Sequence, residues 1–304
     1  MIIRLFLATT LLILSLPLMS QEQTAPQEKE QATEANEPQS DAETPQPAPA
    51  TNPIQAPISL IEQFKADIAK SVDSQLLKPM LAGPNDFLTI TQPDTHSVDK
   101  GTMILLPEWS QAATDVKAMN FLRSHLPKEG WTTITIQPLL APENYPSQQE
   151  KPNIATEENS KAVTAYVDQL TPVMEAVMEA AANYPGIFVV IGQGNNAAML
   201  MAMYQQDDVA KPNAFISLSG YRQSADGNKV FAEQMAMSEI PTLDLVLKRD
   251  VHWVEHFADT RRQAAKQEMK PYYRQREIHN FRAGYYPTEH LAKEIKGWLT
   301  TIGW

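Results

Sequence analysis

No cysteine occurs in this sequence, which excludes disulfide bonds and a lipid-modified cysteine. Basic residues are also scarce: 25 lysines and arginines stand against 36 aspartates and glutamates, for a formal net charge of −11. This acidic balance argues against nucleic acid or an anionic lipid surface as the main partner. Without disulfide bonds, stability must come from core packing, and no internal repeat is apparent.

The first residues have the three regions of a secretory signal peptide. Arg4 supplies the positive charge, residues 5–16 form a mostly apolar run, and Ser20 is a small residue before the expected cleavage site. We expect residues 1–20 to direct export, which makes the protein periplasmic. The alternative is an uncleaved anchor that keeps the chain near a membrane, although the run is shorter than the roughly 20 residues of a spanning helix.

Residues 21–57 are rich in Gln, Glu, Ala, Thr and Pro and contain almost no large apolar side chain. Such a segment cannot bury enough surface to offset its ordering entropy, so we expect a disordered linker. Folded sequence is expected from residue 58 to residue 304.

Within that domain, apolar residues alternate between the spacing of helices and the short runs of buried strands. Helices are expected at about 58–77, 115–126, 159–182 (kinked at Pro172), 197–204, 252–266 and 288–301, with a loop at 140–160. Strands are expected at 87–91, 103–106, 131–136, 187–191, 214–219, 241–247 and 272–278. This alternation predicts an α/β fold with a doubly wound, mostly parallel sheet.

The most informative stretch is a strand, a tight turn and a helix around Gly194. Residues 187–191 form an apolar β-branched run, and Gly192-Gln-Gly194 then turns the chain into the helix. The order matches the nucleophile elbow G-x-S-x-G of α/β hydrolases, with Gly194 at the serine position and Asn196 at the last glycine. The elbow is therefore predicted with its nucleophile position vacant. A dinucleotide-binding turn is the alternative, but Asp207 and Asp208 follow too early to bind a ribose.

Two residues downstream of the elbow stand where an α/β hydrolase places its acid and its histidine. Asp250 follows one strand and His279 follows the last, and the order nucleophile, acid, histidine is that of the fold. Asp226 and Asp244 are alternatives for the acid.

An oxyanion hole would use the backbone N–H of Asn195 and one from the loop after an early strand, at Glu108 or Trp109. A glutamate close to a developing oxyanion is unfavourable, which argues against acyl transfer. A displaced nucleophile, Ser110 or Ser219, is the alternative that would allow an active esterase or acyl-transfer enzyme.

Four stretches carry a resemblance to a known family: "KGTMILLPEW", "FLRSHLPKEGWTTITIQPL", "VVIGQGNNAAML" and "YYRQREIHNF…EIKGWL". From about residue 58 to the end, the chain resembles an uncharacterised family of exported proteobacterial proteins, a domain of unknown function within the α/β-hydrolase superfamily. The resemblance implies the hydrolase fold, an elbow at residues 192–196 and a histidine position at His279. Members of that family tend to carry glycine at the elbow, so the resemblance implies no activity.

A second motif, His252-x-x-Glu255-His256, matches the inverted zinc-peptidase signature H-x-x-E-H. Two histidines four residues apart share a helix face and could bind zinc, with the glutamate as base. A third ligand would have to come from the short remaining tail, so this is the minor alternative.

Taken together, these features predict an exported α/β-hydrolase-fold protein with a degenerate active site, without cofactor, metal or nucleic-acid partner. We expect it to be a binding or accessory module whose crevice holds a small ligand or peptide.

Overall fold

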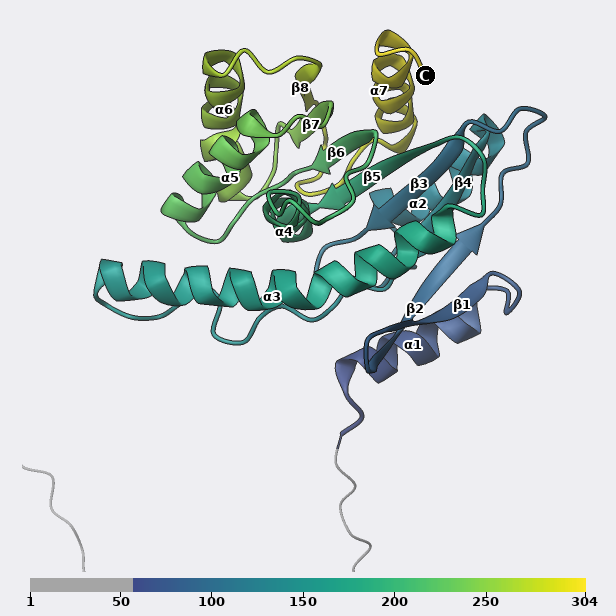
Figure 1. Cartoon of the computed structure of the whole chain (residues 1–304), viewed down its shortest axis with the longest axis horizontal. Coiled ribbons are helices and arrows are strands. Elements are labelled where there is room, and N and C mark those ends of the chain that lie inside the picture. Colours follow the sequence, from purple (N-terminus) through teal and green to yellow (C-terminus); the bar gives the residue numbers. More distant parts are fainter. Residues whose placement is uncertain (1–56) are drawn as a thin grey trace, which may run out of the picture. The chain divides into compact units, whose positions relative to one another are not determined.

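The structure, a computed structural model, describes residues 57–304, so the predicted signal peptide and all of the predicted linker except residue 57 lie outside the described residues. The described part contains an eight-stranded sheet with the order β1-β2-β4-β3-β5-β6-β7-β8 (Figure 1). Strand β2 pairs antiparallel with β1 and β4, and all other neighbours in the sheet are parallel. The predicted α/β class with a mostly parallel sheet is confirmed.

The central strands are almost completely buried, as expected for parallel strands covered by helices on both faces. They are β3 (Gly101–Leu106), β4 (Trp131–Ile136), β5 (Ile187–Gln193), β6 (Ala214–Leu218) and β7 (Thr242–Leu247). Strand β8 (Tyr273–Ile278) forms the edge beside β7. All six lie where the sequence predicts them, within two residues at either end.

Helices cover both faces of the sheet. On one face, α3 (Pro152–Ala181), α4 (Gly194–Met203) and α5 (Ala225–Met237) share a hydrophobic cluster with Ile104 and Leu106 of β3. On the other face, α2 (Ala118–His125) and α7 (Thr288–Thr301) pack on a second cluster that contains Met103 and Leu105. Alternate residues of β3 therefore serve the two cores, as the two-residue period of a strand requires.

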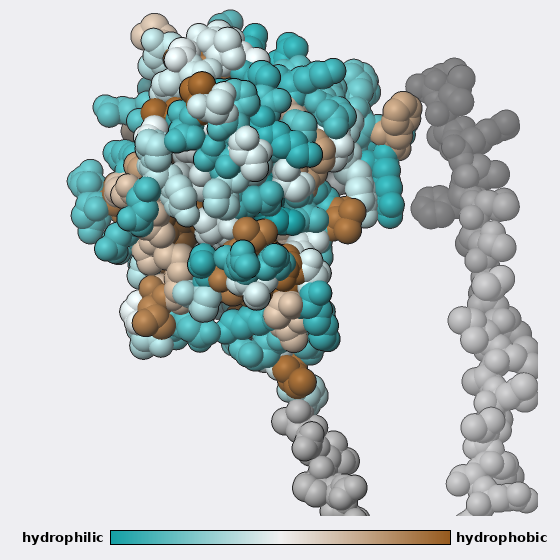
Figure 2. Space-filling model, turned by 90° about the vertical axis from the view of Figure 1, so that its right-hand side faces the viewer, coloured by the Kyte–Doolittle hydropathy of each residue, from teal (hydrophilic) through white to brown (hydrophobic). Residues whose placement is uncertain are grey.

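Two further elements follow α2 and β7. A 3₁₀ turn, η1 (Leu126–Glu129), follows α2, and α6 (His252–Gln267) connects β7 to β8 and packs against α5. None of the helices that the structure describes is long and apolar enough to cross a membrane. On the face that Figure 2 presents, apolar residues are interspersed with hydrophilic ones.

The N-terminal part of the domain differs from its prediction. Helix α1 (Leu60–Ser71) ends six residues earlier than expected, because Val72 is already extended. Leu77–Ala82 then forms β1, which pairs with β2 (Asn85–Gln92) through a turn at Gly83. Pro79 hides this strand in the sequence, yet an edge strand tolerates proline because one of its sides needs no partner.

Two helices also differ from their predictions. The expected loop at 140–160 ends early, because α3 begins at Pro152 and runs through Pro172 as one helix of 30 residues. Its buried stripe, which includes Val163, Leu170 and Val177, holds it against the sheet. Helix α5 is not predicted at all: Gly227 and the polar Asn228 stand in its first turn, where Ser224 caps it by accepting a hydrogen bond from Gly227 N.

Candidate functional site

The predicted corner between strand and helix is present at Gly192–Asn196, and we call it the β5–α4 corner. Strand β5 ends at Gln193, and Gly194 begins α4 with a left-handed φ of +57°. A side chain at Gly192 would bring a Cβ to 2.8 Å from the Ala197 Cα, so glycine there allows the helix to lie close to the strand. The left-handed φ at Gly194 and the close approach of the helix at Gly192 therefore both favour glycine over any residue with a side chain.

The carboxylate of Glu108 occupies the space where a nucleophile would stand. Glu108 lies in the loop after β3, and its Oε2 is 1.5 Å from the position that a Cβ on Gly194 would take. The same oxygen accepts a hydrogen bond of 2.6 Å from the Asn195 backbone N–H. Its other oxygen, Oε1, accepts from the Trp109 backbone N–H at 3.0 Å and from Asn195 Nδ2 at 3.3 Å.

Through these contacts, the Glu108 carboxylate accepts hydrogen bonds from both predicted oxyanion donors. The N–H groups of Asn195 and Trp109 are those that an acyl-transfer enzyme of this fold would point at a tetrahedral intermediate. Here they donate hydrogen bonds to a carboxylate of the protein itself. The structure thus brings together Gly194, Asn195, Glu108 and Trp109, and it gives Glu108 the role of acceptor through its side chain.

The charge of Glu108 is only partly compensated. Burial raises the pKa of its carboxyl above the ordinary value, while the hydrogen bonds from Trp109 and Asn195 and the positive charge of Lys117 lower it in part. The first turn of α4 lies beside the carboxylate, and the exposed N–H groups of a helix start favour a negative group there.

A buried polar network fixes the corner from behind. Asn196, at the last glycine of the elbow pattern, accepts a hydrogen bond of 2.7 Å from Tyr166 Oη on α3 and donates one of 2.6 Å to the Pro107 carbonyl. The Tyr166 ring packs at 5.3 Å on the ring of Trp109. The loop that carries Glu108 is therefore held by two sets of contacts. Pro107 and Trp109 contact Asn196 of α4 and Tyr166 of α3, and the Glu108 carboxylate contacts Asn195.

Asp250 contacts a serine and not a histidine. The Ser219 hydroxyl donates to Asp250 Oδ2 and lies 2.6 Å from Tyr286 Oη, which in turn donates to the Leu245 carbonyl at 3.0 Å. Ser219 follows β6 with a left-handed φ of +51°. Burial raises the pKa of the Asp250 carboxyl, against hydrogen bonds from Ser219 and from the backbone of Val251 and Leu247.

His279 does not take part in this arrangement. It is exposed, and within residues 57–304 no hydrogen bond or ion pair joins it to Asp250. Its neighbour Asn280 is buried and bridges the loops after β7 and β8, accepting from Arg249 N at 2.9 Å and donating to the Arg249 and Arg282 carbonyls at 2.8 Å.

The alternative acids have structural partners. Asp244 is fully buried in β7 and forms an ion pair of 2.8 Å with Arg261 of α6. Asp226 lies at the exposed start of α5, 3.3 Å from Lys229. Neither carboxylate lines the spaces around the β5–α4 corner.

Two adjoining hollows open at the corner. The first, called the crevice below, has a volume of about 210 Å³, and the second measures about 380 Å³ and includes the exposed Ser110. Residues that line the crevice include Glu108, Lys117, Gly194, Ser219, Tyr221, Asp250, Tyr285 and Tyr286. Two carboxylates, one lysine and three tyrosines thus surround this space, and no histidine of residues 57–304 lines it.

The zinc motif does not form a metal site in the described part of the chain. His252 and His256 lie one turn apart on α6 with ring centroids 5.5 Å apart. Glu255 accepts a hydrogen bond of 2.9 Å from the Asp250 backbone N–H. Among residues 57–304, no group of three or more His, Asp or Glu side chains is arranged to hold a metal ion.

Solved structures match the chain over most of its length. Thermogutta terrifontis esterase 2, phosphoramylated by tabun, gives a TM-score of 0.55 at 9% identity over 77% of this chain and 97% of that chain. Est1E from Butyrivibrio proteoclasticus gives 0.54 at 9% identity over 74% and 98%. A putative α/β hydrolase from Agrobacterium tumefaciens, a protein of unknown function, gives 0.51 at 12% identity over 74% and 94%. The chain therefore has the α/β-hydrolase fold, and at these identities the likeness concerns the fold alone.

Residues 4–301 match the family described as "Protein of unknown function (DUF3530)", and the chain belongs to this family. No curated protein matches the sequence. The predicted resemblance to a family of unknown function with the hydrolase fold is confirmed.

Proposed function

We propose that this protein is a non-catalytic member of the α/β-hydrolase fold that binds a ligand in the crevice at the β5–α4 corner. The observation that carries the proposal is the position of Glu108: its carboxylate fills the place of a nucleophilic side chain at Gly194 and accepts the hydrogen bond of Asn195 N. One residue therefore both fills the place of the nucleophile and occupies the oxyanion donor.

The electrostatics of the crevice support this proposal. A tetrahedral intermediate carries a full negative charge and is stabilised by N–H donors aimed at it. An ionised Glu108 on the same donors would repel that charge at short range, in a site partly shielded from water. A nucleophile elsewhere in the crevice would meet the same obstacle, because the two donors are already occupied.

The lining also indicates the kind of ligand. Two carboxylates, Glu108 and Asp250, face the crevice against the single positive charge of Lys117, and Tyr221, Tyr285 and Tyr286 supply aromatic rings. Such a lining favours a ligand with a cationic amine, which carboxylates bind by ion pairing and tyrosine rings by cation–π contact. A small aromatic amine or a basic peptide end has this chemistry.

The proposal includes the place where the protein acts. The charged start, apolar run and small residue of segment 1–20 support export to the periplasm, and residues 21–57 would separate the domain from the site of processing. The N-terminal sequence of protein recovered from the periplasmic fraction tests this part. A start near Gln21 supports it, and recovery of the intact chain in the membrane fraction indicates an anchor.

One alternative has its own supporting observation. Ser219 combines a left-handed φ with a hydrogen bond to a buried carboxylate, in the crevice itself. Strained backbone of this kind is often found at functional residues. An esterase would then use Ser219 as nucleophile with Asp250 as its base.

Covalent labelling with a fluorophosphonate separates the two functions. We expect the folded protein to remain unlabelled, because among residues 57–304 no histidine contacts Ser110 or Ser219, and Ser219 is held by Asp250 and Tyr286. Ser219→Ala and Ser110→Ala are the matched controls: labelling of the wild type that disappears in either variant would overturn the non-catalytic proposal. Gly194→Ser should also fail to react, since Glu108 fills its side-chain position and Asp250 contacts Ser219 instead of His279.

Ligand binding is tested by calorimetry with tyramine and its acidic counterpart 3-(4-hydroxyphenyl)propionate. We expect tyramine alone to bind, and Asp250→Asn to weaken its binding while leaving the fold intact. Equal binding of the two compounds would contradict the cationic preference.

A further inference from the structure

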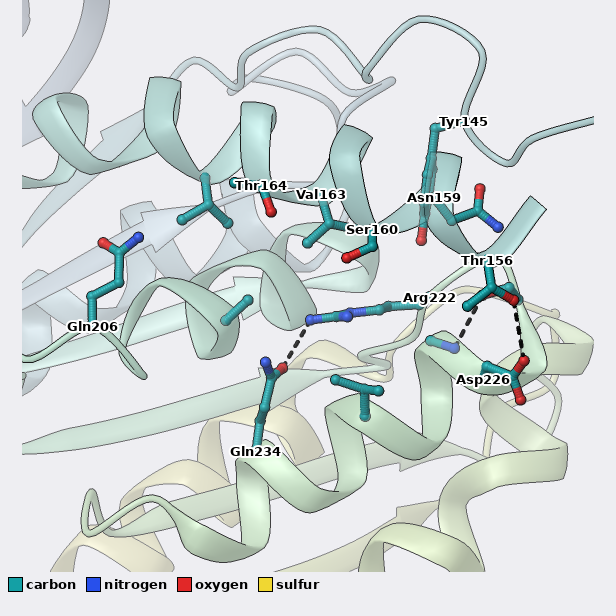
Figure 3. Close-up of a pocket in the computed structure, with 15 residues that line it drawn as sticks. Tyr145, Thr156, Asn159, Ser160, Val163, Thr164, Gln206, Arg222, Asp226 and Gln234 are labelled. Atoms are coloured by element: carbon teal, nitrogen blue, oxygen red, sulfur yellow. Dashed lines mark hydrogen bonds between the residues drawn. The ribbon is translucent and has the colours of Figure 1, made fainter. Parts of the chain in front are cut away.

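A second, separate cavity lies between the helices on the α3 side of the sheet. It measures about 320 Å³ and is lined by residues of α3, α4 and α5, by the loop before α5 and by Tyr145 (Figure 3). We call it the Arg222 cavity. It shares no lining residue with either hollow at the β5–α4 corner. Its volume is in the range of small-molecule sites.

An arginine without an acidic partner lines this cavity. Arg222 is 5% exposed, and among the described residues its guanidinium makes one hydrogen bond, from Nη2 to Gln234 Oε1 at 2.8 Å. Its Nε is buried without any partner. In Figure 3 the Arg222 side chain extends between α3 and α5. Gln234 of α5 lies on one side of it, and Asn159, Ser160 and Thr164 of α3 lie on the opposite side.

The backbone of Arg222 is held firmly, so its position is built into the fold. Asn228, itself fully buried, accepts from Arg222 N at 3.0 Å and donates to the Arg222 carbonyl at 2.5 Å and to the Ser224 carbonyl at 2.8 Å. These bonds fix the loop between β6 and α5. The cavity thus contains a pre-positioned cation, which is costly to bury without a counter-ion.

The remaining lining combines hydrogen-bonding and apolar groups. Tyr145 contributes a buried hydroxyl, and Asn159, Ser160 and Thr164 add neutral polar side chains from α3. Apolar surface comes from Val163, Val167, Ala202 and Val230. A ligand that fits both kinds of surface has one polar head and a hydrocarbon part.

The charges select a singly charged head. One guanidinium is present, and its planar N–H groups match the two oxygens of a carboxylate. Asp226, which is exposed and pairs with Lys229 at 3.3 Å, also lines the cavity and accepts from Thr156 Oγ1 at 3.4 Å, so one negative charge is already nearby. A doubly charged phosphate would meet more repulsion from Asp226 than a singly charged carboxylate would, and it would bring two negative charges to a single guanidinium.

We propose that the Arg222 cavity binds a small monocarboxylic acid, with Arg222 pairing with the carboxylate and the valines of α3 and α5 packing on its hydrocarbon chain. The site is independent of the crevice at the β5–α4 corner. It would make the protein a carrier or sensor of short fatty or aromatic acids.

Isothermal titration with octanoate and with the uncharged octanamide tests the proposal. We expect octanoate to bind and octanamide to bind about tenfold more weakly or not at all, because it lacks the charge that Arg222 pairs with. Arg222→Met should remove octanoate binding. The exposed Arg262, paired with Asp259 on α6, provides the control Arg262→Met, which should bind as the wild type does.

A second variant protects the test against a folding defect in Arg222→Met. Thr164 lines the cavity from the exposed side of α3, so Thr164→Phe can fill the space without touching the buried core. It should lower octanoate affinity while Arg222 is intact. Absence of octanoate binding to the wild type at millimolar concentration, or equal affinity for octanamide, would refute the proposal, whatever the outcome of fluorophosphonate labelling at the corner.

Discussion

Replacing Gly194 by alanine tests the central feature of the site, because the new methyl group and the Glu108 carboxylate need the same space. The Cβ would lie 1.5 Å from Glu108 Oε2 and 2.7 Å from its Cδ, so the carboxylate would have to leave its position. The three nearest atoms to this Cβ all belong to Glu108. Glu108→Ala should therefore remove the obstruction, and the two changes should be strongly coupled.

The magnitude follows from the contacts that are lost. A left-handed φ costs a residue with a Cβ about 1–2 kcal/mol. Displacement of the carboxylate leaves at least one of the buried N–H groups of Asn195 and Trp109 without a partner, which costs about 1–3 kcal/mol more. Gly194→Ala should thus destabilise the wild type by about 2–5 kcal/mol, but the Glu108→Ala background by only about 1–2 kcal/mol. The expected coupling free energy is about 1–3 kcal/mol.

Urea denaturation followed by tryptophan fluorescence measures each corner of this cycle, since Trp109 adjoins the altered residue. Gly83→Ala is the matched control: Gly83 has a φ of +59°, and nothing lies within 4 Å of its added Cβ. It reports the backbone cost alone. The reasoning is refuted if Gly194→Ala costs no more than Gly83→Ala, or if its cost is the same with and without Glu108.

Three further outcomes follow from buried polar groups. Because burial raises the pKa of Glu108 in the folded state, its contribution to stability is complete below the ordinary value of 4.5 and is lost as the pH rises through the raised pKa. The free energy of unfolding of the wild type should therefore fall relative to that of Glu108→Gln over this interval, as measured by urea titrations at a series of pH values. Asp244→Asn leaves Arg261 buried without its counter-ion and should cost about 3–5 kcal/mol in the same assay, whereas a loss below 1 kcal/mol would contradict the buried pair. Tyr166→Phe removes the hydrogen bond to Asn196 and should lower the free energy of unfolding by about 0.5–1.5 kcal/mol, and an unchanged midpoint would show that this bond contributes nothing.

The sequence predicts the central sheet well because the signals there are local. Continuous apolar runs mark the buried parallel strands, and the strict helical spacing of Leu291, Ile295 and Leu299 places α7 at its observed bounds. The errors concern elements whose stability depends on tertiary contacts. Strand β1 contains Pro79 and forms because β2 lies beside it, and α5 carries Gly227 in its first turn, where the Ser224 cap accepts from the glycine N–H.

The candidate site likewise has a part that the local sequence predicts and a part that depends on distant contacts. Two glycines and the strand before them predict the β5–α4 corner, because a tight turn is a local property of the chain. The position of the Glu108 carboxylate depends on Asn195, 87 residues away, and no local pattern encodes that distance. The pairing of Asp250 with His279 followed from chain order, but alternation along β8 buries Ile278 and Asn280 and turns His279 outward. Ser219 and Tyr286 occupy the positions around Asp250 instead.

Because the Glu108 carboxylate occupies the space of a side chain at position 194, it also restricts how these two positions can change during evolution. If serine appears first at position 194, its side chain displaces the Glu108 carboxylate. If residue 108 is shortened first, the buried backbone N–H groups of Trp109 and Asn195 lose their hydrogen-bond acceptor. Each single step is therefore unfavourable, so the two positions should be exchanged together: relatives with a side chain at position 194 should carry a residue at position 108 too short to reach the turn. An inverse correlation between side-chain size at position 194 and side-chain length at position 108 would therefore be the evolutionary consequence of this one contact.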